Sequence, residues 1–160
     1  MADPALLART FTLARQARAA GDHPFGALLA VDGVVVAEAL NRVSTSRDMT
    51  AHAETELVRV LERDGMLDRV GDGVVYASCE PCPQCVGAMF WAGVRHVVYG
   101  LSAARLNALA PSPDGSVHGF TIRAEEIGAA AVPPMRFDGP LDEDTAAEVH
   151  DGFWTRTSRD

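Results

Sequence analysis

The pattern of apolar and polar positions predicts a helix followed by a β-hairpin near the N-terminus. Residues 4–20 place apolar side chains at helical spacing, with arginines elsewhere around the helical wheel, and Gly21 ends this helix. The runs 25–31 and 34–40 are apolar and flank Asp32-Gly33, which is a strong hairpin signal. We therefore expect an antiparallel pair of strands after the first helix.

The rest of the chain alternates helical and strand-like segments. Residues 41–49 are polar and loop-like, and Thr50 is placed to cap the helix that follows, which closes near Gly65. The segments that follow are a buried strand (74–78), an apolar helix (83–92), a strand (96–100), a short helix (103–110), a Pro/Gly/Ser loop (111–118), a strand (129–135) and a terminal helix (142–155). This order predicts an α/β protein, a three-layer α/β/α sandwich around a central mixed sheet.

Composition indicates a globular domain. The chain has 160 residues, 48% hydrophobic and 22% charged, so we expect one domain over residues 1–160 with its own core. No apolar run approaches the roughly 18–20 residues that span a bilayer, and no secretory signal is evident, so we expect a cytoplasmic protein without a membrane partner. The formal charge of −8 disfavours polyanion binding, and a nucleic-acid partner is not expected.

Two short strings carry the chemistry, His52-Ala53-Glu54 and Pro81-Cys82-Pro83-Gln84-Cys85. They offer one imidazole and two thiolates to a metal ion. Structural zinc sites are closed by four protein ligands, whereas catalytic sites use three and leave a position for water. Glu54 is not required as a ligand, so it is available for proton transfer beside zinc-activated water. H-x-E followed by P-C-x-x-C is a known signature of zinc nucleobase deaminases.

Both strings are predicted to lie in the first turns of helices. Helix N-termini carry partial positive charge and unpaired N–H groups, which lower the pKa of a thiol. Cys82 and Cys85 are spaced i, i+3, which puts both sulfurs on one helical face, as a single tetrahedral ion requires.

Two other interpretations remain open. Cys79, Cys82, Cys85 and His52 could close a structural Cys₃His zinc site, and the chain would then be an interaction domain rather than an enzyme. That interpretation leaves Glu54 without a role and requires Cys79 to bend back from a strand end, so a buried apolar Cys79 is preferred. A redox C-x-x-C pair is the second alternative, and it makes the histidine string a coincidence.

A longer set of motifs surrounds the two strings between residues 24 and 100. It comprises Pro24-Phe25-Gly26-Ala27, Asn41, Thr50 to Glu54, Ser78 to Cys85 and Gly87-Ala88. Together they resemble the cytidine/deoxycytidylate deaminase superfamily, in the branch of bacterial guanine deaminases and tRNA adenosine deaminases. Ser78-Cys79-Glu80-Pro81-Cys82-Pro83 is most similar to the guanine deaminases. The resemblance implies the cytidine deaminase-like fold, with a five-stranded sheet.

By this resemblance, His52, Cys82 and Cys85 bind Zn²⁺ and Glu54 transfers the proton. The expected reaction is hydrolytic deamination of a free nucleobase, with guanine, converted to xanthine and ammonia, as the leading substrate. Alternatives are a cytosine/cytidine-type deaminase and an s-triazine (ammeline) deaminase. A tRNA adenosine deaminase is disfavoured, because the chain lacks a basic footprint.

The resemblance also assigns substrate-binding residues. Asn41 matches an asparagine that hydrogen-bonds the base or ribose, with an ordinary Asx turn as the alternative. Phe25 matches an aromatic residue that stacks on the base, or it packs in the core. Trp91 walls the pocket or packs under the sheet. Asp114 and Glu143 match acids of the guanine deaminases, although the sequence around Asp114 departs from theirs and a solvated helix cap explains Glu143 equally well.

The C-terminal stretch is the last candidate, because a predicted helix there places Phe153 and Trp154 near one side. The guanine deaminases that the chain resembles form homodimers in which the C-terminal segment helps to close an active site. We therefore expect a homodimer with Phe153 and Trp154 covering a substrate pocket. The alternative is that this helix packs on the sheet of its own chain.

Overall fold

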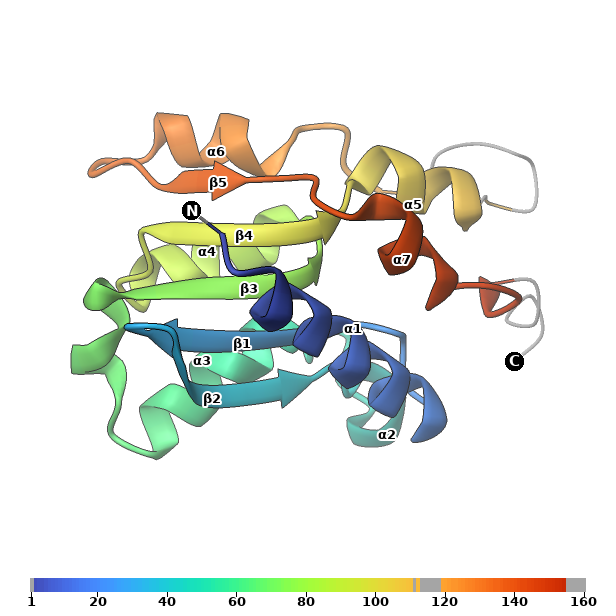
Figure 1. Cartoon of the computed structure of the whole chain (residues 1–160), viewed down its shortest axis with the longest axis horizontal. Helices are drawn as coiled ribbons and strands as arrows, with labels where there is room; N and C mark the ends of the chain where they lie inside the picture. The colour runs from blue at the N-terminus through green and yellow to red at the C-terminus, as the bar shows by residue number, and fades with distance from the viewer. Residues whose placement is uncertain (1, 111, 113–118, 155–160) are drawn as a thin grey trace.

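A five-stranded sheet forms the centre of the computed structural model, which describes residues 2–110, 112 and 119–154. The strands are β1 (Gly26–Val31), β2 (Val34–Leu40), β3 (Gly73–Cys79), β4 (His96–Leu101) and β5 (Arg136–Asp138). Their order is β2-β1-β3-β4-β5, seen from bottom to top in Figure 1. β1 is antiparallel to both of its neighbours, whereas β3, β4 and β5 run parallel. The sheet is therefore mixed, as the sequence predicts.

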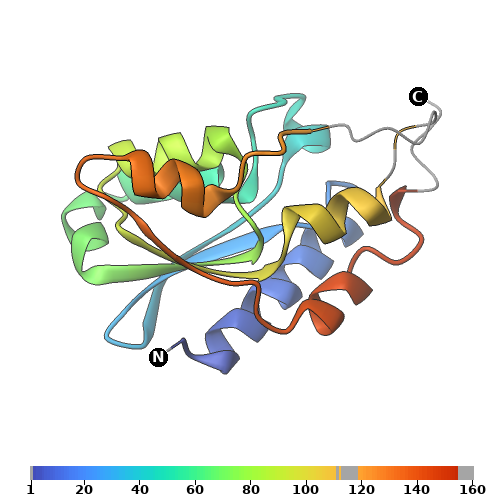
Figure 2. The same ribbon diagram turned by 90° about the horizontal axis from the view of Figure 1, so that it is seen from above.

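Helices cover both faces of this sheet, as Figure 2 shows. One layer holds α3 (Ala53–Arg63), α4 (Pro83–Trp91) and α6 (Ala124–Ala130), and the other holds α1 (Pro4–Ala19), α5 (Ala103–Leu109) and α7 (Glu143–Glu148). The short helix α2 (Val43–Ser46) and a 3₁₀ helix (Leu67–Asp72) lie in connections. The three-layer α/β/α sandwich is confirmed. No described helix is long and apolar enough to cross a membrane.

Each face of the sheet has its own core, and β1 contributes to both because successive side chains of a strand point to opposite faces. Leu28 lies in the cluster that contains Phe11 of α1, whereas Leu29 lies in the cluster that contains Leu57 of α3 and Met89 of α4. Every residue of β1 is buried. The sheet thus fixes the positions of both helical layers, including the two helices that carry the chemical motifs.

The N-terminal half follows the predicted pattern closely. Asp3 caps α1 by accepting a hydrogen bond from the backbone N–H of Ala5 at 2.8 Å. Asp32 and Gly33 have φ angles of 51° and 77°, and positive φ at both positions is what a two-residue hairpin turn requires.

Two predicted loop and cap positions are corrected. Residues 41–49 contain α2, because the buried Asp22 accepts hydrogen bonds from the backbone N–H groups of Ser44 and Thr45 at 2.9 Å and stabilises its first turn. Thr50 does not cap α3, since its hydroxyl donates to Asp48 instead. His52 is the N-cap residue.

The predicted C-terminal elements are also corrected. Residues 129–135 are not a strand, because Pro133 and Pro134 lack the N–H that a ladder needs, and β5 begins after them. The predicted helix 142–155 is much shorter, since α7 ends at Glu148. Gly152 has a φ of 65°, which interrupts a helix at that point.

The start of β1 packs so closely on α1 that it requires glycine. A Cβ at Gly26 would lie 2.4 Å from the Cβ of Leu13 and 2.8 Å from backbone atoms of Ala14 and Thr10. We predict that Gly26→Ala lowers the free energy of unfolding by about 2–3 kcal/mol, the upper part of the range for overpacking. Urea unfolding measures this change. Gly71→Ala is the control, because a Cβ there meets nothing within 4 Å, and an equal loss in both variants would contradict the close-packing explanation.

Candidate metal and active site

The site lies where two helices of one layer begin. His52 is the N-cap residue of α3 and Cys82 is the N-cap residue of α4, both with extended backbone angles. Neither side chain caps its own helix, so each is available to face the other. α4 follows β3 directly, and the carboxyl ends of parallel strands are where sites of α/β proteins commonly form.

Three potential ligand atoms converge there. The Nδ1 of His52 lies 3.5 Å from the Sγ of Cys82 and 3.6 Å from the Sγ of Cys85, and the two sulfurs are 3.6 Å apart. Tetrahedral zinc with ordinary bond lengths separates sulfur from nitrogen by about 3.6 Å and sulfur from sulfur by about 3.8 Å. The donor set therefore fits zinc in both chemistry and spacing, and its members are the three residues that can reach one ion in the described part of the chain.

The two cysteines and the histidine shift one another's pKa values. The hydrogen bond with Cys85, and then that with His52, lowers the pKa of Cys82 to about 4. The pKa of Cys85 is raised, first by its hydrogen bond with Cys82 and then by burial. Cys82 raises the pKa of His52 in turn. One sulfur thus carries the negative charge, and a bound metal requires the second thiol to lose its proton as well.

Glu54 lies beside this set without belonging to it. It is in the first turn of α3, is only 6% exposed and lines the same cavity as His52 and Cys82. Burial is the main cause that raises its carboxyl pKa, and the charge of Cys82 adds to this shift. A buried carboxyl group next to a three-residue ligand set is placed to exchange protons with the cavity.

Cys79 is the residue on which the structural-zinc alternative depends. It lies at the end of β3, is buried and lines the cavity, but it is outside the set of residues that can reach a common ion. Burial raises its pKa well above the ordinary value, so it remains a thiol. The geometry supports three protein ligands rather than four.

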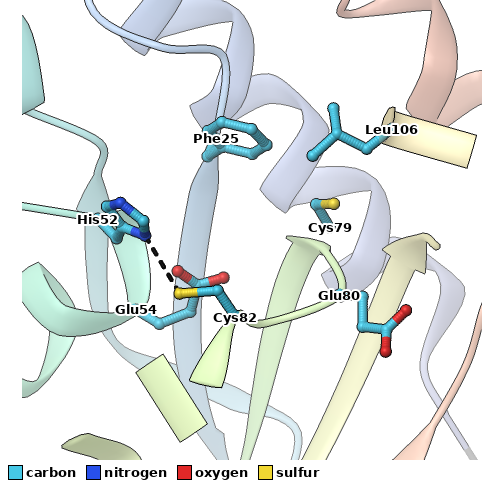
Figure 3. Close-up of a pocket in the computed structure, with 7 residues that line it drawn as sticks. All are labelled: Phe25, His52, Glu54, Cys79, Glu80, Cys82 and Leu106. Carbon is cyan, nitrogen blue, oxygen red and sulfur yellow. Dashed lines mark hydrogen bonds between the residues drawn. The ribbon is translucent and has the colours of Figure 1, made fainter. Parts of the chain in front are cut away.

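The cavity is small, and none of its described lining residues is a lysine or an arginine. Its volume is about 100 Å³, and it is lined by Phe25, His52, Glu54, Cys79, Glu80, Cys82 and Leu106. Figure 3 shows Phe25 and Leu106 on the side opposite Glu54 and Cys82. The metal-ligand set and an apolar wall thus face one another across the cavity.

The C-terminal segment meets this wall from outside the cavity. The Phe25 ring centroid lies 5.3 Å from that of His150 and 6.1 Å from that of Trp154, and Phe153 packs edge-on against Trp154 at 4.8 Å. Neither Phe153 nor Trp154 is among the residues that line the cavity. The segment thus contacts Phe25 of the same chain, and the homodimer with a shared pocket stays a prediction.

Two further predicted substrate residues have protein partners. Asn41 is buried, and its side-chain oxygen accepts a hydrogen bond from the backbone N–H of Val43 at 3.0 Å, which is the Asx turn of the alternative interpretation. Glu143 accepts hydrogen bonds from the backbone N–H and the hydroxyl of Ser102, and these lower its pKa. Neither residue lines the cavity.

Trp91 is not brought to the cavity. It ends α4, about 13 Å along the helix axis from Cys82 at 1.5 Å per residue, and it is 85% exposed. The expectation that it walls the pocket or packs under the sheet is therefore wrong for this chain. Asp114 lies outside the described residues.

Sequence reasoning missed two residues of the cavity wall, Glu80 and Leu106. The buried carboxylate of Glu80 points away from Cys82 in Figure 3 and accepts hydrogen bonds from the backbone N–H groups of Ala103 and Ala124, both at 2.9 Å. Glu80 therefore links the starts of α5 and α6 to the loop between β3 and α4 that precedes Cys82. Its position between a strand and Pro81-Cys82 was the available signal, whereas Leu106 gave none.

Comparisons of the sequence point to one family. A family model described as the zinc-binding region of cytidine and deoxycytidylate deaminases matches residues 2–101. A probable cytosine deaminase of Schizosaccharomyces pombe is 36% identical over 154 residues, which cover 95% of this chain and 92% of that protein. The guanine deaminase of Bacillus subtilis is 44% identical over 94 residues, which cover 58% of this chain and 60% of that enzyme.

Solved structures share the fold. The guanine deaminase of Nitrosomonas europaea matches 97% of this chain and 86% of its own with a TM-score of 0.78, at 23% identity. The guanine deaminase of Bacillus subtilis matches 81% of this chain and 91% of its own with a TM-score of 0.60, at 33% identity.

We predict about one zinc ion per chain, held by three protein ligands. Cys82→Ala should lose most of its zinc, because two remaining ligands do not close the site, whereas Cys79→Ala should keep it. Elemental analysis of both purified variants measures the difference. Loss of zinc from Cys79→Ala to the same extent would make Cys79 a fourth ligand and the site structural.

Proposed function

The chain belongs to the cytidine and deoxycytidylate deaminase family, and on that basis we propose that it hydrolyses the exocyclic amino group of a free nucleobase, with guanine as the leading substrate. The observation that carries the proposal is the meeting of His52, Cys82 and Cys85 at zinc-ligand distances beside the buried Glu54, which is not a ligand. In a structural zinc site, which is closed by its protein ligands, that carboxylate would have no role.

In the proposed reaction His52, Cys82 and Cys85 hold zinc, which makes water a nucleophile at neutral pH when it is bound. Glu54 accepts a proton from the water and delivers it to the departing amine. A carbon–oxygen bond forms, the carbon–nitrogen bond breaks, and ammonia leaves, so Glu54 ends the cycle in its starting protonation state. Phe25 offers its ring face to the flat base.

A free base is favoured over a nucleotide or a nucleic acid. Binding of phosphate groups relies on lysine and arginine, and none of the described residues that line the cavity is a lysine or an arginine. The formal charge of the whole chain is −8. A small neutral heterocycle is therefore the partner that this cavity suits best, and the tRNA adenosine deaminase alternative is the least favoured.

Cytosine is the second candidate, and two observations favour it. The relative from Schizosaccharomyces pombe, a probable cytosine deaminase, aligns with 95% of this chain, whereas the alignment to the guanine deaminase of Bacillus subtilis covers 58%. The cavity of about 100 Å³ is also small, in the range in which a single six-membered ring fits more easily than two fused rings.

A substrate panel separates these candidates. We expect zinc-loaded protein to release ammonia from guanine or cytosine faster than from cytidine or adenosine, because a cavity of about 100 Å³ leaves little room for a ribose. Ammeline, a single six-membered ring, tests the s-triazine alternative in the same panel. Coupled detection of ammonia gives kcat/KM for each compound. Faster turnover of adenosine in a tRNA anticodon stem than of every free base would overturn the proposal.

Glu54→Gln tests the mechanism on whichever base is best. We expect zinc content and fold to be retained while kcat falls by about 10²–10⁴-fold or more, since glutamine preserves the shape but cannot transfer a proton. Glu62→Gln, at an exposed position of the same helix, should leave kcat unchanged. Turnover by Glu54→Gln at the rate of Glu62→Gln would exclude Glu54 as the proton-transfer group.

A further inference from the structure

Arg18, near the end of α1, bridges two carbonyl groups of the C-terminal segment. Its guanidinium donates to the backbone oxygens of Val149 and Asp151, both at 2.7 Å, and lies 5.8 Å from the ring centroid of Phe153. Carbonyls at a helix C-terminus carry partial negative charge, and a cation there is stabilising. The last turn of α7 has no basic residue of its own. Arg18 therefore supplies that cation from another helix.

The backbone that Arg18 holds carries the rings that contact Phe25. The Nε1 of Trp154 donates to the Nδ1 of His150 at 3.2 Å, and the two rings are nearly parallel, at 11°. Burial lowers the pKa of His150 to about 4, so its ring is neutral and able to accept this bond near neutral pH. Both rings lie against Phe25. A continuous series of contacts thus joins Arg18 to the cavity wall.

The same series is separate from the contacts that hold α7 in the fold. Ala146 and Ala147 are buried in the core cluster of α1, and Glu143 is bound to Ser102. These contacts do not involve Arg18. Val149 belongs to the same buried cluster, and His23 contacts the rings of Phe153 and Trp154. Loss of the guanidinium should therefore loosen residues 150–154 in place without detaching α7.

We propose that Arg18 is a positioning residue that sets the substrate-facing wall, acting on Phe25 through the backbone of residues 149–151 and the rings of His150 and Trp154. The expected effect on KM rests on the proposed function, because Phe25 is taken to face the base. The expected effects on the position of residues 150–154 do not, since their contacts are independent of any substrate.

Trp154 provides a direct readout. The chain has two tryptophans, so in a Trp91→Phe background the fluorescence comes from Trp154 alone. We expect Arg18→Ala to shift this emission to longer wavelength and to raise its quenching by acrylamide, relative to the Trp91→Phe parent. Arg15→Ala, an exposed arginine on the same helix, is the matched control and should match the parent. Arg18→Lys should be intermediate, because one ammonium group does not span both carbonyls as the guanidinium fork does.

Two measurements then test whether the C-terminal segment positions Phe25 in the cavity wall. Zinc release to a chromogenic chelator should be faster in Arg18→Ala, because Phe25 lines the same cavity as His52 and Cys82 and a displaced ring would expose them more. On the best base of the panel, KM should rise by about tenfold, equivalent to about 1.4 kcal/mol of binding, with a smaller change in kcat. Asp138→Asn, which removes the carboxylate charge that faces His96 and Arg136 at the β4–β5 edge, controls for a loss of stability alone and should change neither quantity.

The outcomes are distinguishable. If the Trp154 emission of Arg18→Ala equals that of Arg15→Ala, Arg18 does not hold the segment and the proposal is wrong. If the emission shifts but the zinc-release rate does not, the segment does not position the wall and the proposal is equally wrong. If the parent deaminates none of the bases, the proposed function fails, while emission and zinc release still decide the role of Arg18.

Discussion

The candidate site depends on two helices of one layer that begin side by side. The 3.5 Å separation between the Nδ1 of His52 and the Sγ of Cys82 exists because α3 and α4 pack on the same face of the sheet through Leu57, Val86 and Met89. A slip of one residue along either helix would move a ligand by about 1.5 Å and turn it by about 100°. Zinc-ligand geometry tolerates only a few tenths of an ångström. The buried core under the helices therefore sets the precision of the site.

Two carboxylates that line the cavity, one in α3 and one between β3 and α4, have different environments. Both carboxylate oxygens of Glu80 accept hydrogen bonds from backbone N–H groups at the starts of α5 and α6. This side chain therefore holds α5 and α6 to the loop that precedes Cys82. Around Glu54, burial and then the charge of Cys82 outweigh the hydrogen bonds from its own backbone N–H and from Cys85, so its pKa is raised. Divergent environments for neighbouring carboxyl groups are a common way to divide supporting and proton-transfer roles.

The sequence predicts features that depend on short-range spacing and misses those that depend on distant contacts. His52, Cys82 and Cys85 could be identified because each ligand lies at a helix start whose signals are local. Trp91 could not be placed from the pattern, because α4 is apolar nearly all round. The structure resolves it: Met89 faces the core, and Trp91 is turned about 200° from it at about 100° per residue, so it faces outward.

The C-terminal elements were harder to predict for a similar reason. β5 has three residues and pairs only at one edge of the sheet, so its own sequence carries a weak signal beside two prolines. α6 starts where Glu80, more than forty residues earlier, accepts the N–H of Ala124. Glu126 caps the N–H of Arg123 locally, but the contact with Glu80 depends on the fold and gives no signal in the local sequence.

The extent of the family match bears on which base is the substrate. The family match ends at residue 101, so it includes the ligand set and Glu54, whose chemistry is common to many bases. Leu106 and the rings that contact Phe25, His150 and Trp154, lie beyond that point. Membership in the family therefore accounts for deamination. The apolar wall draws on both parts of the chain, because Phe25 lies inside the matched region and Leu106 lies beyond it. A relative that aligns over both parts is more informative about that wall than one that shares only part of the length. The cytosine alternative therefore carries weight beside the higher local identity to a guanine deaminase.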